Sequence, residues 1–283
     1  METVIGFFER LFISAAPLAI ASTGALFSEL AGVLGIFVEG FMNAGAFFAW
    51  IITGRTGSIF WGTAITACAA GFSGWCLARF VRKTGANPFI VGLTVNIAAA
   101  GINDTLSIMW FGTKGVLRSP DLLMPSHVPA VYVSWFVVIC AALVIKHTHW
   151  GLKLRASGLS PEAARERGIR PGLYWEAAWA VSACLAAIAG AFLCFRVGSY
   201  TPGGIAGRGW ISIAAVYLGF RNALGVYIAA VVFALAETAG RNIQNMTGIS
   251  ATALLGLPNA LALLLYVISQ GIRKKRRKKL NPY

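Results

Sequence analysis

The sequence predicts an all-α, polytopic membrane helix bundle with about 8–9 transmembrane segments, and three observations lead to this class. Among its 283 residues, 57% are hydrophobic and only 12% are charged, and the mean hydropathy is +0.71. A soluble domain does not hide so large an apolar fraction. The apolar residues form long segments separated by polar turns, as helices that cross a bilayer require. Thirty-two glycines agree with this class, because small residues allow membrane helices to pack closely.

Nine apolar segments follow one another along the chain. They cover residues 11–27, 31–53, 58–78, 88–111, 128–145, 173–195, 210–219, 223–237 and 251–270. The second begins irregularly, since Glu29 and Glu39 stand beside glycines within residues 28–40. Irregular backbone in a bilayer is tolerated only against protein or a watery cavity. This stretch is therefore either a re-entrant element or an ordinary loop. Nine full spans place the N-terminus outside, whereas eight spans and a re-entrant piece place it inside.

Several polar side chains fall inside these apolar segments. Asn96, Asn103 and Asp104 share one segment, and Glu39 and Asn43 share another. Such groups are costly in lipid, so we expect them to face the bundle interior or a cavity. They either tie helices together or contact a transported solute.

Other features of the composition exclude alternative functions. The net charge of +14 comes from basic residues in loops and in the tail, which indicates membrane topology and not nucleic-acid binding. The five cysteines lie in apolar segments without CxxC spacing and read as small core residues. The glycine-rich residues 198–209 do not match a phosphate-binding loop. The three histidines and ten acidic residues are too scattered to suggest a catalytic or metal site, so we expect no enzyme activity and no cofactor.

The distribution of basic residues predicts the orientation. If the tail is cytoplasmic, seventeen of the 24 lysines and arginines fall on that side and six on the other. Cytoplasmic loops carry the excess of positive charge in membrane proteins. The loop 150–172 and the basic tail 271–283 are therefore expected in the cytoplasm, and residues 198–209 on the outer side. Residues 1–270 form the predicted membrane domain.

The loop at 151–169 is the longest polar interruption and carries the signals of a short helix. Ser160 suits the N-cap, Pro161 the first helical position, and Glu162 complements the positive end of the helix dipole. Gly168 suits the residue after the helix, and Pro171 forbids continuation. A helix of about two turns is not stable alone in water. The segment is thus either a well-capped surface loop or a docking element for a soluble partner.

Several motifs in this chain carry a resemblance to a known family. The loop GLKLRASGLSPEAARERGI resembles the cytoplasmic coupling segment of bacterial ABC importer permeases of the branched-chain amino acid and ribose class. The stretches GALFSE with AGV, then Glu39-Gly40, and Tyr200-Thr201-Pro202 followed by AGRGWI, are similar to the nucleoside-type (simple sugar-like) permeases. The similarity extends over nearly the whole chain. The family usually has Asn at Gly35, Pro near Ala223 and Tyr at Asn259, and the first departure bears on substrate identity.

The resemblance implies a permease subunit in the bacterial inner membrane that pairs with a second, similar or identical permease. An ABC ATPase would dock on the cytoplasmic side, and an extracytoplasmic binding protein would deliver a nucleoside. The residues expected to couple to the ATPase are Gly158, Ser160, Pro161, Glu162, Ala163, Ala164 and Gly168. The solute pathway is expected at Glu39, Asn43, Asn96, Asn103 and Asp104. A bulky residue at Gly158 or Ala163 is expected to uncouple ATP hydrolysis from uptake in a folded protein.

Two other readings stay open. A secondary transporter driven by protons or sodium would use Glu39, Asp104 and Glu237 as coupling carboxylates, although no inverted repeat supports it. An ABC permease for sugars or branched-chain amino acids is the second alternative.

Overall fold

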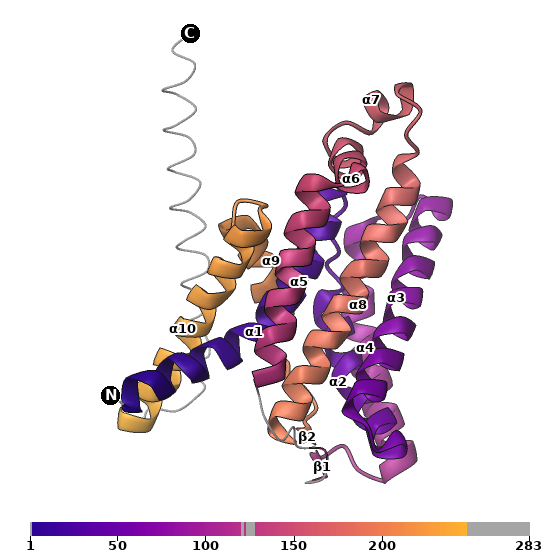
Figure 1. Cartoon of the computed structure of the whole chain (residues 1–283). Coiled ribbons are helices and arrows are strands. Elements are labelled where there is room, and N and C mark those ends of the chain that lie inside the picture. Colours follow the sequence, from indigo (N-terminus) through magenta and orange to yellow (C-terminus); the bar gives the residue numbers. More distant parts are fainter. Residues whose placement is uncertain (1, 120–121, 123–127, 248–283) are drawn as a thin grey trace.

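The computed structural model describes residues 2–119, 122 and 128–247, and in them the chain is a bundle of helices (Figure 1). Two short strands, β1 (Leu117–Arg118) and β2 (Ser199–Tyr200), pair antiparallel at one end. The helices are α1 (Glu2–Leu30), α2 (Val38–Thr56), α3 (Ile59–Thr84), α4 (Pro88–Phe111), α5 (Val128–His147), α6 (His149–Leu159), α7 (Pro161–Glu166), α8 (Pro171–Val197), α9 (Arg208–Leu218) and α10 (Ala223–Thr247).

Six of these helices are long and apolar enough to cross a membrane, namely α1, α3, α4, α5, α8 and α10. The all-α, multi-pass class is confirmed. The predicted count of 8–9 spans is not reached within the described residues, and the apolar segment 251–270 lies outside them. The segment 210–219 was expected to be a span, which is wrong. Its helix α9 has 11 residues, about 16 Å, and a bilayer core is about 30 Å thick.

The core of the bundle lies where α2 packs against α8. Small residues on both helices bring the two backbones together: a Cβ atom at Gly45 would lie 2.5 Å from the Cα of Ala187. A Cβ atom at Gly190 would likewise overlap the carbonyl oxygen of Met42. Ala187 and its neighbours on the same face of α8 are buried. Because glycine and alanine permit this approach, α2 is enclosed by other helices although it is not among the six candidate spans.

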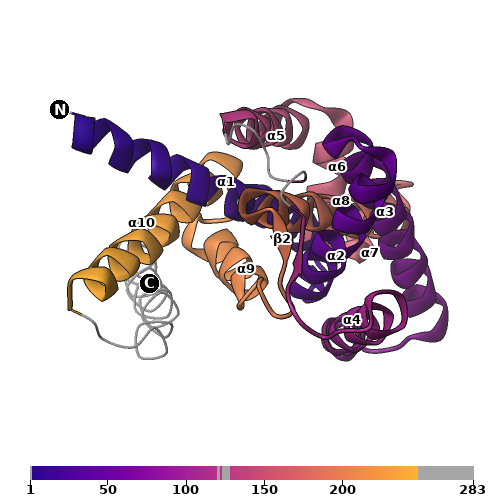
Figure 2. The ribbon, with the colours of Figure 1, turned by 90° about the horizontal axis from the view of Figure 1, so that it is seen from below.

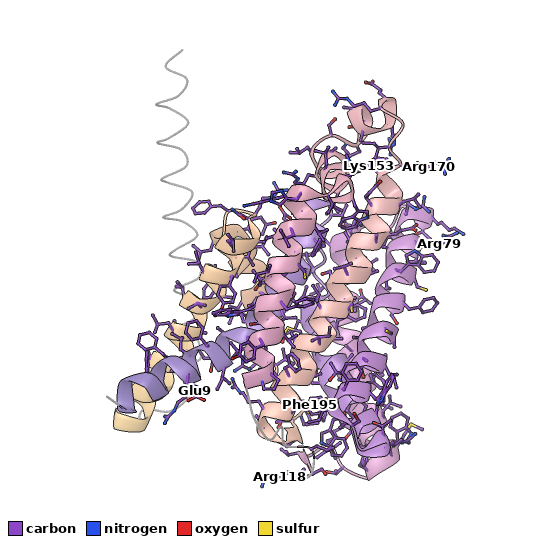
Figure 3. All side chains as sticks on the ribbon, viewed as in Figure 1. Glu9, Arg79, Arg118, Lys153, Arg170 and Phe195 are labelled. Carbon is purple, nitrogen blue, oxygen red and sulfur yellow. The ribbon has the colours of Figure 1, made fainter. Side chains whose placement is uncertain are left out.

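The two ends of the bundle differ in the elements they carry. Figure 3 places Arg79, Lys153 and Arg170 at the end that holds α6 and α7, which we call the α7 end. Arg118 lies at the opposite end beside the strands, which we call the β end. Helix α1 starts toward the β end and reaches the α7 end at its last turn (Figure 1). Arg79, Lys153 and Arg170 belong to the set of basic residues that the sequence placed on one side of the membrane. In the structure they lie at the same end of the bundle, as that count requires.

Two irregular stretches interrupt the bundle. The first, residues 31–37, separates α1 from α2, and the second, residues 201–207, precedes α9. The ring of Phe37 packs on that of Trp179 with centroids 4.7 Å apart, and Trp179 lies about 12 Å along α8 from its first residue. Helix α2 thus starts inside the bundle and not at its end. The indole nitrogen of Trp179 donates a 2.9 Å hydrogen bond to the carbonyl of Val33, which satisfies part of this irregular backbone.

Candidate functional site

The predicted short helix after Ser160 is present as α7, with the expected caps. The hydroxyl of Ser160 accepts a 3.4 Å hydrogen bond from the amide of Ala163, and Pro161 occupies the first turn. Gly168 follows in the left-handed conformation, with φ of +74°, and its amide donates to the carbonyl of Arg165. The cap signals in the sequence are confirmed, because they depend only on local backbone geometry.

One side of the α6–α7 segment packs on the bundle and the other is free. Leu154, Ser157 and Ala164 are buried, whereas Ala163 is exposed and the side chain of Leu159 is 80% exposed. The segment is therefore a fixed ledge that presents an apolar residue to the surroundings of the α7 end. Glu162 and Gly168 are also exposed, while Ser160 and Pro161 are half-buried.

Gly158 does not belong to the free side of this ledge. A Cβ atom there would collide with the carbonyl of Leu30 and lie 2.7 Å from the amide of Gly32. The backbone of α6 thus lies directly on the last turn of α1. The expectation that a bulky residue at Gly158 leaves the fold intact is not supported by this packing, and Ala163 is the position that fits it.

Asn96 and Asn103 face the bundle, as expected, and both bind backbone groups of α2 or of the stretch just before it. The amide of Asn96 accepts a 2.7 Å hydrogen bond from the nitrogen of Gly40 and donates one of 2.9 Å to the carbonyl of Ile36. Asn103 donates a 3.1 Å hydrogen bond to the carbonyl of Asn43. In the structure these two residues tie α4 to the irregular start of α2.

Asp104 departs from the expectation of an interior position. Its side chain is 41% exposed and lies 3.9 Å from the ammonium group of Lys114. Asp104 is one helical position beyond Asn103, so it points away from the face that meets α2.

Asn43 borders a small cavity near the β end. The cavity has a volume of about 60 Å³ and lies between α2, the end of α8 and the stretch after β2, with Leu193, Tyr200, Thr201 and Ile205 among its lining residues. The side-chain oxygen of Asn43 is buried and has no hydrogen-bond partner among the described residues. A cavity of this size accommodates a few water molecules, whereas sites for small organic ligands are about 300 Å³ or more.

Glu39, in the first turn of α2, binds the start of α9. Its Oε1 atom accepts a 2.9 Å hydrogen bond from the amide of Gly207, and its Oε2 atom accepts one of 2.6 Å from the amide of Gly209. These amides belong to the N-terminal end of α9, where the helix dipole favours negative charge. Glu39 was expected in the solute pathway, and the structure places it at the junction of α2 and α9.

Arg208, between those two glycines, pairs with Glu237 of α10. Both side chains are largely buried. Arg208 was counted with an outward loop, and in the structure the amides on either side of it contact Glu39 at the start of α2. Glu237 was expected near the end of its span, and the candidate span Ala223–Gly240 does end within one turn of it, although α10 itself continues to Thr247.

Two further ion pairs lie toward the α7 end. Glu29, at the end of α1, lies 3.3 Å from Nε of Arg221 and accepts a 3.1 Å hydrogen bond from the hydroxyl of Tyr217. Arg82 of α3 lies 2.6 Å from the buried carboxylate of Glu176 in α8. The sequence reasoning did not single out Glu176. An acidic residue inside an apolar segment signals that a cationic or hydrogen-bonding partner lies next to it.

A multi-pass bundle with interrupted helices and interior carboxylates has features that occur in membrane transporters. The chain belongs to the family described as branched-chain amino acid transport system / permease component, whose model it matches over residues 7–268. It is thus an ABC transporter permease component, a multi-pass membrane protein that is not itself catalytic, as expected from its motifs. Systems of this kind include a separate ATPase and a binding protein.

Individual relatives are similar over most of their length. The nucleoside ABC transporter permease protein NupC of Lactococcus lactis is 26% identical over 252 residues, covering 80% of this chain and 79% of that protein. The guanosine ABC transporter permease protein NupQ of Bacillus subtilis is 23% identical over 263 residues, covering 80% and 79%. The putative glucose ABC transporter permease protein TsgC13 of Haloferax volcanii is 24% identical over 266 residues, covering 87% and 80%.

A solved structure shares the fold. PsaBC from Streptococcus pneumoniae, in complex with Fab, superposes with a TM-score of 0.59 and 13% identity, covering 97% of this chain and 95% of that one.

Proposed function

We propose that this permease component imports nucleosides or related small polar solutes and is driven by an ABC ATPase that docks on the α6–α7 ledge. Two relatives named for nucleoside or guanosine transport support the solute class. The interior amide of Asn43, whose side-chain oxygen has no hydrogen-bond partner among the described residues, suits a solute rich in hydroxyl and ring nitrogen groups, because an amide offers both a donor and an acceptor.

The docking role is supported mainly by the exposed side of the α6–α7 ledge. Leu159 exposes 80% of its surface on a segment whose other side is packed on α1 at Gly158. A motor protein that seats on Leu159 and Ala163 would move α1 directly, because the contact at Gly158 is backbone against backbone. Packed helices transmit such a displacement as a rigid shift.

The solute path is proposed to run along the face where α2 lies between α4 and α9 (Figure 2). Glu39 and Asn43 lie on α2 at this face, and the exposed Thr201 lines the small cavity together with Asn43. A second permease would cover this face and complete the path. The small cavity beside Asn43 would widen during transport, since its present volume is below that of a nucleoside site.

The charge distribution supports an orientation with the α7 end in the cytoplasm and the β end toward the binding protein. The two bacterial relatives named for nucleoside or guanosine transport support the inner membrane of a bacterium as the location. The basic segment 271–283 would also be cytoplasmic, although it lies outside the described residues.

Purification from the native membrane in mild detergent tests this function. We expect a cassette ATPase and a second permease to co-purify, and reconstituted vesicles to take up labelled guanosine when binding protein and ATP are added. Uptake that survives ATP depletion but stops with an ionophore would instead identify an ion-coupled transporter. Glucose in place of guanosine tests the sugar alternative that one relative suggests.

A further inference from the structure

We propose that Glu39 is a built-in anion that fills the binding site formed by the first amides of α9, and that it makes the path through this permease reject negatively charged solutes. The claim that Glu39 excludes anionic solutes rests on the proposed function. The claim that Glu39 occupies an anion site rests on the structure alone. The proposal narrows the solute class to molecules without a carboxylate or phosphate group.

The geometry of the carboxylate is that of a bound ligand. Each oxygen of Glu39 accepts one amide hydrogen, from Gly207 at 2.9 Å and from Gly209 at 2.6 Å. Helix α9 has no side-chain cap of its own, since its N-cap residue is Gly207 with φ of +81°. The cap therefore comes from α2, which is 168 residues away in sequence. Free amides at a helix N-terminus bind anions through the dipole and through hydrogen bonds, and here a side chain takes that place.

The position of Gly209 shows that the site is built for close approach. A Cβ atom there would lie 2.5 Å from both the Cα and the nitrogen of Glu39. Any side chain at Gly209 would force α9 away from the start of α2 and open both hydrogen bonds. Gly209 thus lets the starts of α2 and α9 meet at their backbones, whereas Gly207 supplies the left-handed conformation that precedes α9.

Among the described residues, three arginines that contact interior carboxylates are engaged in ion pairs. Arg208 pairs with Glu237, Arg221 with Glu29 and Arg82 with Glu176. An anionic solute at the junction of α2 and α9 would compete with Glu39 for the amides of α9, and it would repel the carboxylate it displaced. The cost of an unpaired charge inside the bundle is several kcal/mol, so such a solute is disfavoured. An uncharged nucleoside or sugar avoids this cost.

Replacement of the carboxylate tests the anion site through thermal unfolding of the purified permease with its co-purified partners. We expect Glu39→Ala to lower Tm by on the order of 5 °C, and sodium formate to restore most of that loss. Formamide has nearly the same size but no charge and should restore nothing. Glu9→Ala removes an exposed carboxylate from α1, far from α9, and should change neither Tm nor the response to formate.

Two variants keep the test decisive if Glu39→Ala folds poorly. Glu39→Gln retains the shape and one acceptor, so it should lose less stability and gain nothing from formate. Gly209→Ala should lose stability without rescue, because it moves the amides away. Failure of formate to raise Tm of Glu39→Ala above the formamide control would overturn the occupied anion site.

Uptake measurements test the selectivity. Guanosine uptake by the wild-type vesicles should be insensitive to excess guanosine monophosphate, and uptake by Glu39→Ala should become at least about tenfold more sensitive to it. Equal inhibition of both proteins would overturn the selectivity. An absence of guanosine uptake in the wild type, with formate rescue intact, would instead reject the proposed function and leave the anion site standing.

Discussion

Gly158 of α6 and Gly32, just beyond α1, meet backbone to backbone: a Cβ atom at Gly32 would lie 2.8 Å from the Cα of Gly158. This contact joins the proposed docking ledge to the first helix of the bundle. It leaves room for no side chain, so we expect Gly158→Leu to destabilise the protein by about 3 kcal/mol or more. Thermal unfolding of the purified protein measures the loss. Gly101→Leu is the matched control, because a Cβ atom there has no neighbour within 4 Å. An equal loss of stability in both variants would contradict the proposed contact.

Ala163→Trp separates docking from folding. Ala163 is exposed on α7, so the indole should leave Tm unchanged while it obstructs a partner at the α7 end. We expect guanosine uptake to fall about tenfold or more, equivalent to ~1.4 kcal/mol of lost coupling. Thr84→Trp adds the same bulk to an exposed position at the end of α3 and should transport normally. Undiminished uptake by Ala163→Trp would remove the ledge from the mechanism.

Asn96→Leu tests the tie between α4 and α2. The substitution leaves the amide of Gly40 and the carbonyl of Ile36 without their hydrogen-bond partner. Unpaired buried backbone groups cost roughly 1–3 kcal/mol each, so we expect a loss of about 3 kcal/mol. Titration with a denaturing detergent measures it. Thr94→Leu, on the exposed side of the same helix, should stay within about 0.5 kcal/mol of the wild type. A similar stability of Asn96→Leu would show that the tie is dispensable.

The sequence was most informative where structure is set locally. The caps of α7 depend on Ser160, Pro161 and Gly168 and on nothing distant, so they could be read directly from the residue types. The membrane class follows from composition in the same way. The family motifs supplied what composition does not, namely the kind of transporter.

Contacts between residues far apart in the sequence could not be predicted from residue types and hydropathy. Arg208 and Glu237 are each recognisable as charges in an apolar region, but their pairing depends on α9 running back inside the bundle. Hydropathy treats residues 210–219 as a span because it registers apolar character and not the depth at which a helix begins. Glu39 was identified as a candidate, whereas its two partners are backbone amides that no residue type reveals.

The pair formed by Arg82 and Glu176 holds α3 to α8 beneath the ledge, with an N–O distance of 2.6 Å. Arg82→Met would leave the buried carboxylate of Glu176 without its cation. Complete burial makes such a loss worth about 3–5 kcal/mol, but the side chain of Arg82 is 39% exposed, so we expect about 2 kcal/mol.

A double-mutant cycle isolates this interaction. The variant Arg82→Met, Glu176→Leu removes both charges and should recover most of the stability lost in Arg82→Met, because an apolar pair suits this environment. Guanosine uptake should recover with it if the pair serves only to hold the helices together. A double variant as unstable as Arg82→Met would mean that Glu176 has a second task in the fold. Restored stability without restored uptake would mean that the charges themselves take part in coupling the ledge to the bundle.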